Sequence, residues 1–296
     1  MLTVVLLLAV GIVLARVPGL PANMARALDV FVIWVALPGL VIALVPTLEL
    51  TADAVVPVAV AWGSLLLSAV VVLLLSRASG WSRRTTGTLL LVVPLGNTSF
   101  LGIPAVEALL GVEHLPYAIV YDQLGSFLAL TTYGAVVAGR YGAASRPSLG
   151  GTIRRVVTFP PFLALVAATV MIATGVPDVV GDLAGRVGAT VTPLTMVAVG
   201  MRVGLPRLDA SFAPLVSGLV LRLGAVPAAA YGVMLALGGS GLAWEASVLE
   251  AAMPPMVTAS VIAIDAGLDE RLAANLVGVG VLAAMLTLPA WAALLT

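Results

Sequence analysis

Helix-breaking and polar residues occupy the middle of a long apolar stretch, between Pro94 and Pro104. A helix surrounded by lipid gains nothing from such residues, because every backbone group released from the helix must find a partner away from water. They fit a helix that is broken beside a cavity, which is where secondary transporters bind substrates near the middle of the membrane. We therefore expect half of a substrate-binding site here, formed by Pro94, Gly96, Asn97, Thr98 and Ser99.

A second break is expected in the run from Met253 to Ser260. Its second proline forces Pro254 out of the helical region, so a helix that restarts after Pro255 has an exposed N-terminus. A helix N-terminus carries about half a positive charge and several free N–H donors, which suit an anion such as a carboxylate. We expect Pro254, Pro255 and Thr258 to form the other half of the site. Two kinked helices without a binding role are the alternative interpretation.

The composition predicts an integral membrane protein with several spans. Of the 296 residues, 61% are hydrophobic and 9% are charged, against about 25% charged in a typical soluble domain. The net charge of zero argues against nucleic acid as a partner. Cysteine and lysine are absent, which excludes disulfides, thiolate catalysis and a lysine Schiff base. We expect no metal and no cofactor, and the lone His114, read as a surface loop residue, makes an intramembrane enzyme a poor candidate.

Apolar windows predict an all-α polytopic membrane protein with ten transmembrane helices. They lie near 1–16, 27–45, 54–76, 85–111, 115–139, 156–175, 182–201, 212–237, 245–265 and 271–295. Twelve of the fourteen arginines fall on one side of this arrangement. Because arginine-rich short loops stay in the cytoplasm, both termini are expected outside a cell membrane. The chain is then one transmembrane domain, 1–296, in contact with lipid.

The two halves resemble each other, approximately 1–140 and 154–296, joined by a cytoplasmic linker at about 140–154. Prolines recur at comparable places in the two halves: Pro38 and Pro193, Pro57 and Pro214, Pro94 and Pro254. Because each half has five predicted spans, the second half would enter the membrane upside down, as an inverted repeat. A coincidence of prolines in an apolar chain is the alternative.

Five polar groups are expected at depth within the spans: Glu107, Asp122, Gln123, Arg222 and Glu250. Ionisable groups inside a membrane are costly and usually functional. The three carboxylates are candidates for coupling transport to H⁺ or Na⁺. Arg222 could attract an anionic substrate or pair with Glu250, and a purely structural pair would explain it equally well.

The run from Gly96 to Pro104 resembles the Gly-Asn-Thr-x-Phe-Leu-Gly-x-Pro signature of the auxin efflux carrier family, which includes plant PIN exporters and bacterial malate and malonate permeases. The resemblance extends along the whole chain. Gly111 follows the fourth predicted span, Ala252-Met253-Pro254 lies at the ninth, and Thr287-Leu288-Pro289 lies in the tenth.

This resemblance implies ten helices in two inverted five-helix repeats, with the broken fourth and ninth helices crossing as in bile-acid symporters and sodium–proton antiporters. It also implies a homodimer, in which a second bundle of spans moves like an elevator past a scaffold bundle. Asn97 and the backbone around Pro94 and Pro254 would line the site. The long cytoplasmic loop of the plant proteins is missing.

The expected function is a secondary transporter, a permease or efflux carrier, of small organic anions such as carboxylates. The alternative is a sodium- or proton-coupled symporter or antiporter of the bile-acid symporter fold. That alternative requires an acidic residue beside a broken helix, whereas both breaks carry hydroxyls and Asn97.

Overall fold

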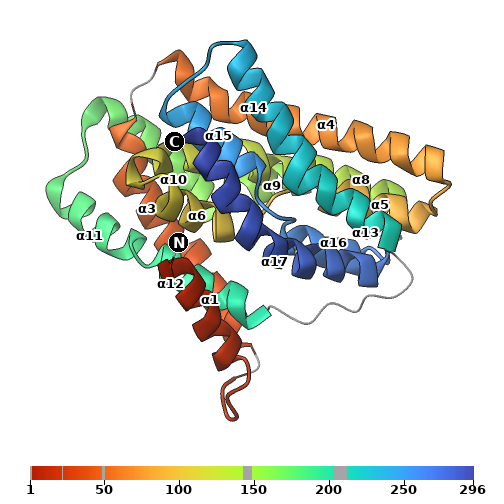
Figure 1. Ribbon diagram of the computed structural model, residues 1–296. Coiled ribbons are helices and arrows are strands. Elements are labelled where there is room, and N and C mark those ends of the chain that lie inside the picture. Colours follow the sequence, from red (N-terminus) through yellow and green to blue (C-terminus); the bar gives the residue numbers. More distant parts are fainter. Residues whose placement is uncertain (1, 22, 49–50, 143–148, 203–211) are drawn as a thin grey trace.

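A computed structural model describes residues 2–21, 23–48, 51–142, 149–202 and 212–296. Within these ranges the chain is helical, and its extended backbone pairs only as an isolated bridge. Figure 1 shows the helices packed side by side, with the first helix lying against the last third of the chain. The all-α class predicted from the sequence is confirmed.

The helices form two groups, each held by contacts among its own members. The smaller group consists of α1 (Leu2–Leu14), α2 (Met24–Phe31), η1 (Val32–Ala36), α3 (Leu37–Leu44), η2 (Val45–Thr47), α10 (Pro160–Thr174), α11 (Asp178–Gly188) and α12 (Val191–Arg202). The larger group consists of η3 (Ala52–Val55), α4 (Val56–Ser79), α5 (Arg83–Val92), η4 (Thr98–Gly102), α6 (Ile103–Leu109), η5 (Val112–His114), α7 (Leu115–Val120), η6 (Tyr121–Phe127), η7 (Leu130–Gly134), α8 (Ala135–Tyr141), α13 (Phe212–Val220), η8 (Leu221–Ala225), α14 (Val226–Ala236), α15 (Leu242–Ala251), α16 (Val257–Asp265) and α17 (Glu270–Leu295).

The described residues contain five helices that are long and apolar enough to cross a membrane: Met24–Thr47, Ala52–Ser79, Asp178–Arg202, Phe212–Ala236 and Glu270–Leu295. A sixth span results if Gly150–Val157 and Pro160–Thr174 are counted as one bent helix. The chain is therefore a polytopic membrane protein. Helices occupy all ten predicted ranges, but several are short or broken, so the count of ten spans stays a prediction.

The start of the second half differs from the expectation of one straight helix over 156–175. Helix α9 (Leu149–Val157) and α10 are separate and bent by 61°. The reason is local, because Phe159 is extended and Pro160 and Pro161 begin a new helix. The predicted linker at 140–154 is thus helical from Leu149 onward, and residues 143–148 lie outside the described ranges.

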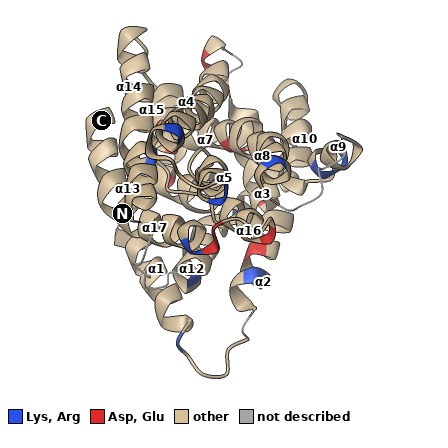
Figure 2. Cartoon of the chain, turned by 90° about the vertical axis from the view of Figure 1, so that its right-hand side faces the viewer, with Lys and Arg blue, Asp and Glu red and all other residues tan. Residues whose placement is uncertain are grey.

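Several arginines lie together at one end of the larger group. The Arg84 guanidinium donates to the carbonyls of Gly267 and Leu268, each at 3.0 Å, and Arg83 donates to the carbonyl of Arg140. These bonds join the beginning of α5 to the end of α8 and to the turn between α16 and α17. Figure 2 views this end, where basic segments of α5, α8 and α9 face the viewer.

Small residues allow the closest helix contact in the smaller group, between α1 and α12. A Cβ added to Gly11 would lie 2.9 Å from the Gly200 Cα, and one added to Gly200 would collide with the Leu8 carbonyl. Without a hydrophobic driving force in lipid, such close backbone packing is a main source of helix association.

We therefore expect Gly200→Ala to lower the melting temperature of the purified protein, because α1 must move away from α12. Thermal unfolding in detergent measures this. Gly232→Ala on α14 is the matched control, because a Cβ there meets no atom within 4 Å. Equal melting temperatures for the two variants would contradict the α1–α12 contact.

Candidate binding site at the broken helices

The two helix breaks lie against each other. Gly96 and Pro255 form an antiparallel bridge. The Asn97 N–H donates to the Pro254 carbonyl and the Met256 N–H donates to the Leu95 carbonyl, each at 2.8 Å. Two segments that are far apart in the sequence therefore supply hydrogen-bond partners to each other's backbone groups at the point where each leaves its helix.

Proline explains why these segments leave the helix. Pro94, Pro254 and Pro255 have no N–H, so none of them can donate a helical hydrogen bond. The two residues that donate across the bridge, Asn97 and Met256, each stand directly before a new helix, η4 and α16. The chain thus changes from helix to extended backbone and back to helix in both segments.

Arg222 of η8 binds carbonyls that closely follow α5 and α15, the helices that precede the two breaks. Its side chain is buried, with Nε donating to the Met253 carbonyl at 2.7 Å and Nη1 donating to the Pro94 carbonyl at 3.3 Å. A helix C-terminus carries a partial negative charge, so one guanidinium neutralises the C-terminal sides of α5 and α15 together. Gly96 makes this possible, because a Cβ there would collide with the guanidinium. Arg222 also interacts electrostatically with Glu250 and Tyr121.

Asp122 of η6 lies beside the restart of the first broken helix. One carboxylate oxygen accepts hydrogen bonds from Thr98 Oγ1 at 2.5 Å and Ser99 Oγ at 2.6 Å, and the other accepts from Gln123 Nε2 at 2.7 Å. An acidic side chain therefore stands beside a broken helix. Sequence reasoning placed only hydroxyls and Asn97 there, because the carboxylate comes from the following helix.

Two neighbouring cavities open at the breaks, and they share Asn97, Phe100 and Thr258. The first, of about 130 Å³, is lined by Ile33, Leu37, Asn97, Ser99, Phe100, Asp122, Phe127, Leu130, Phe159, Met256 and Thr258. The second, of about 500 Å³, is lined by Arg26, Asp29, Asn97, Phe100, Val199, Arg202, Val257, Thr258, Val261 and Asp265. Each lining combines residues of the smaller and the larger helix group, so the cavities lie between the groups.

Hydrogen-bond donors without partners face these cavities. Asn97 is 1% exposed, and its Nδ2 has no hydrogen-bond partner among the described residues. No side chain caps the N-terminus of η4 or of α16, and the hydroxyl-bearing Thr258 lies in the first turn of α16. An amide, a hydroxyl and two uncapped helix N-termini together can bind an anion.

The other predicted residues occupy different surroundings. Glu107 is exposed and accepts a hydrogen bond from Thr192 Oγ1 at 2.5 Å. Glu250 is completely buried, and neither of its carboxylate oxygens has a hydrogen-bond partner among the described residues. Gln123 is buried beside Asp122, and its Oε1 likewise has no partner within the described chain.

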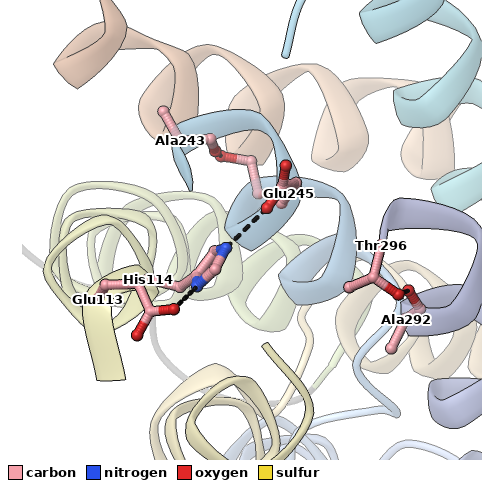
Figure 3. A network of polar contacts seen from close by, with 7 residues as sticks. Glu113, His114, Ala243, Glu245, Ala292 and Thr296 are labelled. Atoms are coloured by element: carbon pink, nitrogen blue, oxygen red, sulfur yellow. Dashed lines mark hydrogen bonds and ion pairs between the residues drawn. The ribbon is translucent and has the colours of Figure 1, made fainter. Parts of the chain in front are cut away.

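The expectation of a surface position for His114 is wrong. The side chain is buried, and its Nε2 lies 2.7 Å from Glu245 Oε2, as Figure 3 shows. Glu113 lies on the other side of the ring, with 3.8 Å between Nδ1 and Oε1. The first turn of α15 covers the loop, and this long-range packing is not visible in the local sequence. The histidine thus links the two halves of the chain.

Sequence reasoning missed the aromatic wall of the smaller cavity. Phe127 of the larger group stacks on Phe159 with ring centroids 4.0 Å apart, and Phe162 lies 6.3 Å from Phe127. The Phe-Pro-Pro run before α10 is a local signal for Phe159, because the prolines fix where the helix begins. Nothing in the sequence around Phe127 indicates its partner.

Helix breaks beside cavities between two helix groups are typical of membrane transporters. Residues 1–292 match the family model described as "Membrane transport protein". The chain therefore belongs to this family, the auxin efflux carrier family that the Gly96–Pro104 run resembles. It is similar to an uncharacterized transporter of Methanothermobacter thermautotrophicus, with 29% identity over 99% of this chain and 97% of that protein. An uncharacterized transporter of Methanocaldococcus jannaschii is 25% identical over 69% of this chain and 67% of its own length.

Replacing Arg222 tests whether one guanidinium stabilises both breaks through hydrogen bonds to their carbonyls. Arg222→Met should lower stability by about 1–3 kcal/mol for each buried carbonyl that loses its donor, those of Pro94 and Met253. Thermal unfolding of purified protein measures the loss. Arg77→Met, at an exposed position on α4, is the control. The assignment is wrong if the Arg222 variant is no less stable than the control.

Proposed function

We propose that this membrane transporter is a secondary transporter, a permease or efflux carrier, that moves small organic anions by alternating access. The observation that carries the proposal is the buried Asn97 amide, which has no partner among the described residues and faces cavities between two helix groups. An anion bound there would accept hydrogen bonds from groups that otherwise lack acceptors. Because both groups line the site, movement of one group past the other would change the side from which it is reached.

The arrangement of the helices supports an inverted repeat with crossing broken helices. The first two predicted spans of each half belong to the smaller group, and the last three belong to the larger group. The two broken helices hold equivalent places in the halves, and their breaks pair. We infer that the smaller group is the scaffold and that the larger group, which contains the breaks, moves as an elevator.

The cavity linings favour a carboxylate with an apolar body. The smaller cavity is polar at Asn97, Ser99, Asp122 and Thr258, and the rest of its lining is aliphatic, aromatic or methionine. Its volume of about 130 Å³ is close to that of a cavity that holds benzene. The lining contains no cation, so a second carboxylate would lack a partner there. We infer a monocarboxylate whose apolar end lies toward Phe127 and Phe159.

The larger cavity supports a proposal for the side that this conformation faces. Arg26 and Arg202 line it, and Arg202 forms an ion pair with Asp29. Both arginines belong to the arginine-rich side, which the positive-inside rule assigns to the cytoplasm. We infer that the site is open to the cytoplasm in this conformation, with both termini outside.

A cation-coupled symporter or antiporter is the second candidate, because Asp122 lies beside the break. Na⁺ would then strengthen substrate binding in the wild type and leave Asp122→Asn unaffected. Binding that does not respond to Na⁺ in either protein would exclude sodium coupling.

A binding screen of the purified protein tests the main proposal. Benzoate, malonate and lactate are titrated, and we expect benzoate to bind best because its ring fills the apolar end. Asn97→Ala should weaken benzoate binding roughly 10- to 100-fold, the effect of losing a hydrogen bond to a charged group. Asn23→Ala, at an exposed asparagine, is the matched control. The proposal fails if no organic anion binds. If both variants bind benzoate like the wild type, Asn97 is not part of the binding site.

A further inference from the structure

Glu250 is a buried ionisable group that lacks hydrogen bonds among the described residues. It lies in the last turn of α15, is completely buried, and has no hydrogen-bond partner for either carboxylate oxygen among the described residues. Its carboxylate packs against the backbone of Gly102, where a Cβ would lie 2.6 Å from Oε1. Glycine at 102 therefore leaves the space that this carboxyl group fills. Buried ionised carboxylates require pairing or hydrogen bonds, and this one has neither close by.

The charges that act on Glu250 are those of Asp122 and Arg222. Tyr121 of η6 interacts electrostatically with both Arg222 and Glu250. Asp122 accepts three hydrogen bonds, which stabilise its ionised form. The negative charge of that form balances the single positive charge of Arg222. A second ionised carboxylate would add a buried negative charge without a donor. The arrangement therefore fits a neutral carboxylic acid at position 250.

The other two candidate carboxylates do not meet these conditions. Glu107 on α6 is exposed, and its carboxylate accepts a hydrogen bond from Thr192. Asp122 has donors on both oxygens. Glu245, at the opposite end of α15, has a partner, because its Oε2 lies 2.7 Å from His114 Nε2. Glu250 thus differs from every other acidic group near the breaks by being buried without any donor.

We propose that Glu250 is a proton-binding site and that its proton favours binding of an anion at the neighbouring breaks. The proton comes from the aqueous phase and forms an O–H bond with one carboxylate oxygen. While it is bound, the buried charges of Arg222 and Asp122 cancel, so an anionic substrate brings the net charge of the site to −1; without the proton the same anion would bring it to −2. Release of the proton would then weaken anion binding. The coupling rests on the proposed function, whereas the proton site itself does not.

Infrared spectroscopy of the purified, substrate-free protein tests the proton site directly. We expect the carbonyl stretch of a buried carboxylic acid near neutral pH in the wild type, and its loss in Glu250→Gln. Glu107→Gln is the matched control and should keep the band. The proposal is overturned if the wild type lacks the band, or if the band survives in Glu250→Gln.

The pH dependence of benzoate binding tests the coupling. Benzoate affinity should fall by up to about tenfold per pH unit in the alkaline range for the wild type and for Glu107→Gln, as expected for one linked proton. Glu250→Gln, which stays neutral, should bind with nearly constant affinity over the same range. Glu250→Asp keeps a titratable group and should restore the dependence, which a purely structural role would not do.

The outcomes separate the two claims. A pH-independent affinity in the wild type, with benzoate bound, overturns the coupling. If benzoate and the other acids do not bind at all, the proposed function fails, while the infrared result still decides whether Glu250 carries a proton.

Discussion

Inside a membrane, each break in a helix releases carbonyl and N–H groups that lipid cannot satisfy, so they must find partners within the protein or face a cavity. Here two breaks satisfy one another in part through the Gly96–Pro255 bridge, and the Arg222 guanidinium binds carbonyls of both segments. The carbonyl side of the paired breaks is therefore neutralised by the Arg222 guanidinium. The N–H side, at the starts of η4 and α16, has no side-chain cap and faces the cavities.

This asymmetry gives the spacing of residues in the Gly96–Pro104 run a physical reason. Gly96 leaves space for the Arg222 guanidinium, and Gly102 leaves space for the Glu250 carboxyl group. Thr98 and Ser99, between the glycines, donate to Asp122. The run from the first half is thus shaped around charged side chains of other helices, and within it the Asn97 Nδ2 group is left without a hydrogen-bond partner among the described residues.

Much of this could be predicted from local sequence. Apolar windows locate the helices, because a membrane span needs an uninterrupted apolar length, and the prolines locate the breaks, because proline cannot donate a helical hydrogen bond. The asparagine and the hydroxyls at the breaks identify most of the polar residues that line the smaller cavity, Asn97, Ser99 and Thr258, but not Asp122.

The partners of these residues could not be predicted in the same way. Arg222 lies far from Pro94 in the sequence, and whether it binds carbonyls or a carboxylate depends on packing that no local pattern encodes. The Phe127–Phe159 stack and the burial of His114 also depend on contacts between distant segments. The bend between α9 and α10, by contrast, follows from the adjacent Pro160 and Pro161, so it could have been predicted from the sequence.

The central claim, that an anion binds where the two breaks meet, can be tested by chemical protection, because the chain contains no cysteine. Val261→Cys lies one turn beyond Thr258, lines the larger cavity and is 49% exposed. Ala78→Cys, at an exposed position on α4, serves as the reference site. We expect benzoate to slow the reaction of Val261→Cys with a thiol reagent and to leave the reaction of Ala78→Cys unchanged. If benzoate binds the protein yet both cysteines react at unchanged rates, the anion site lies elsewhere and the account is contradicted.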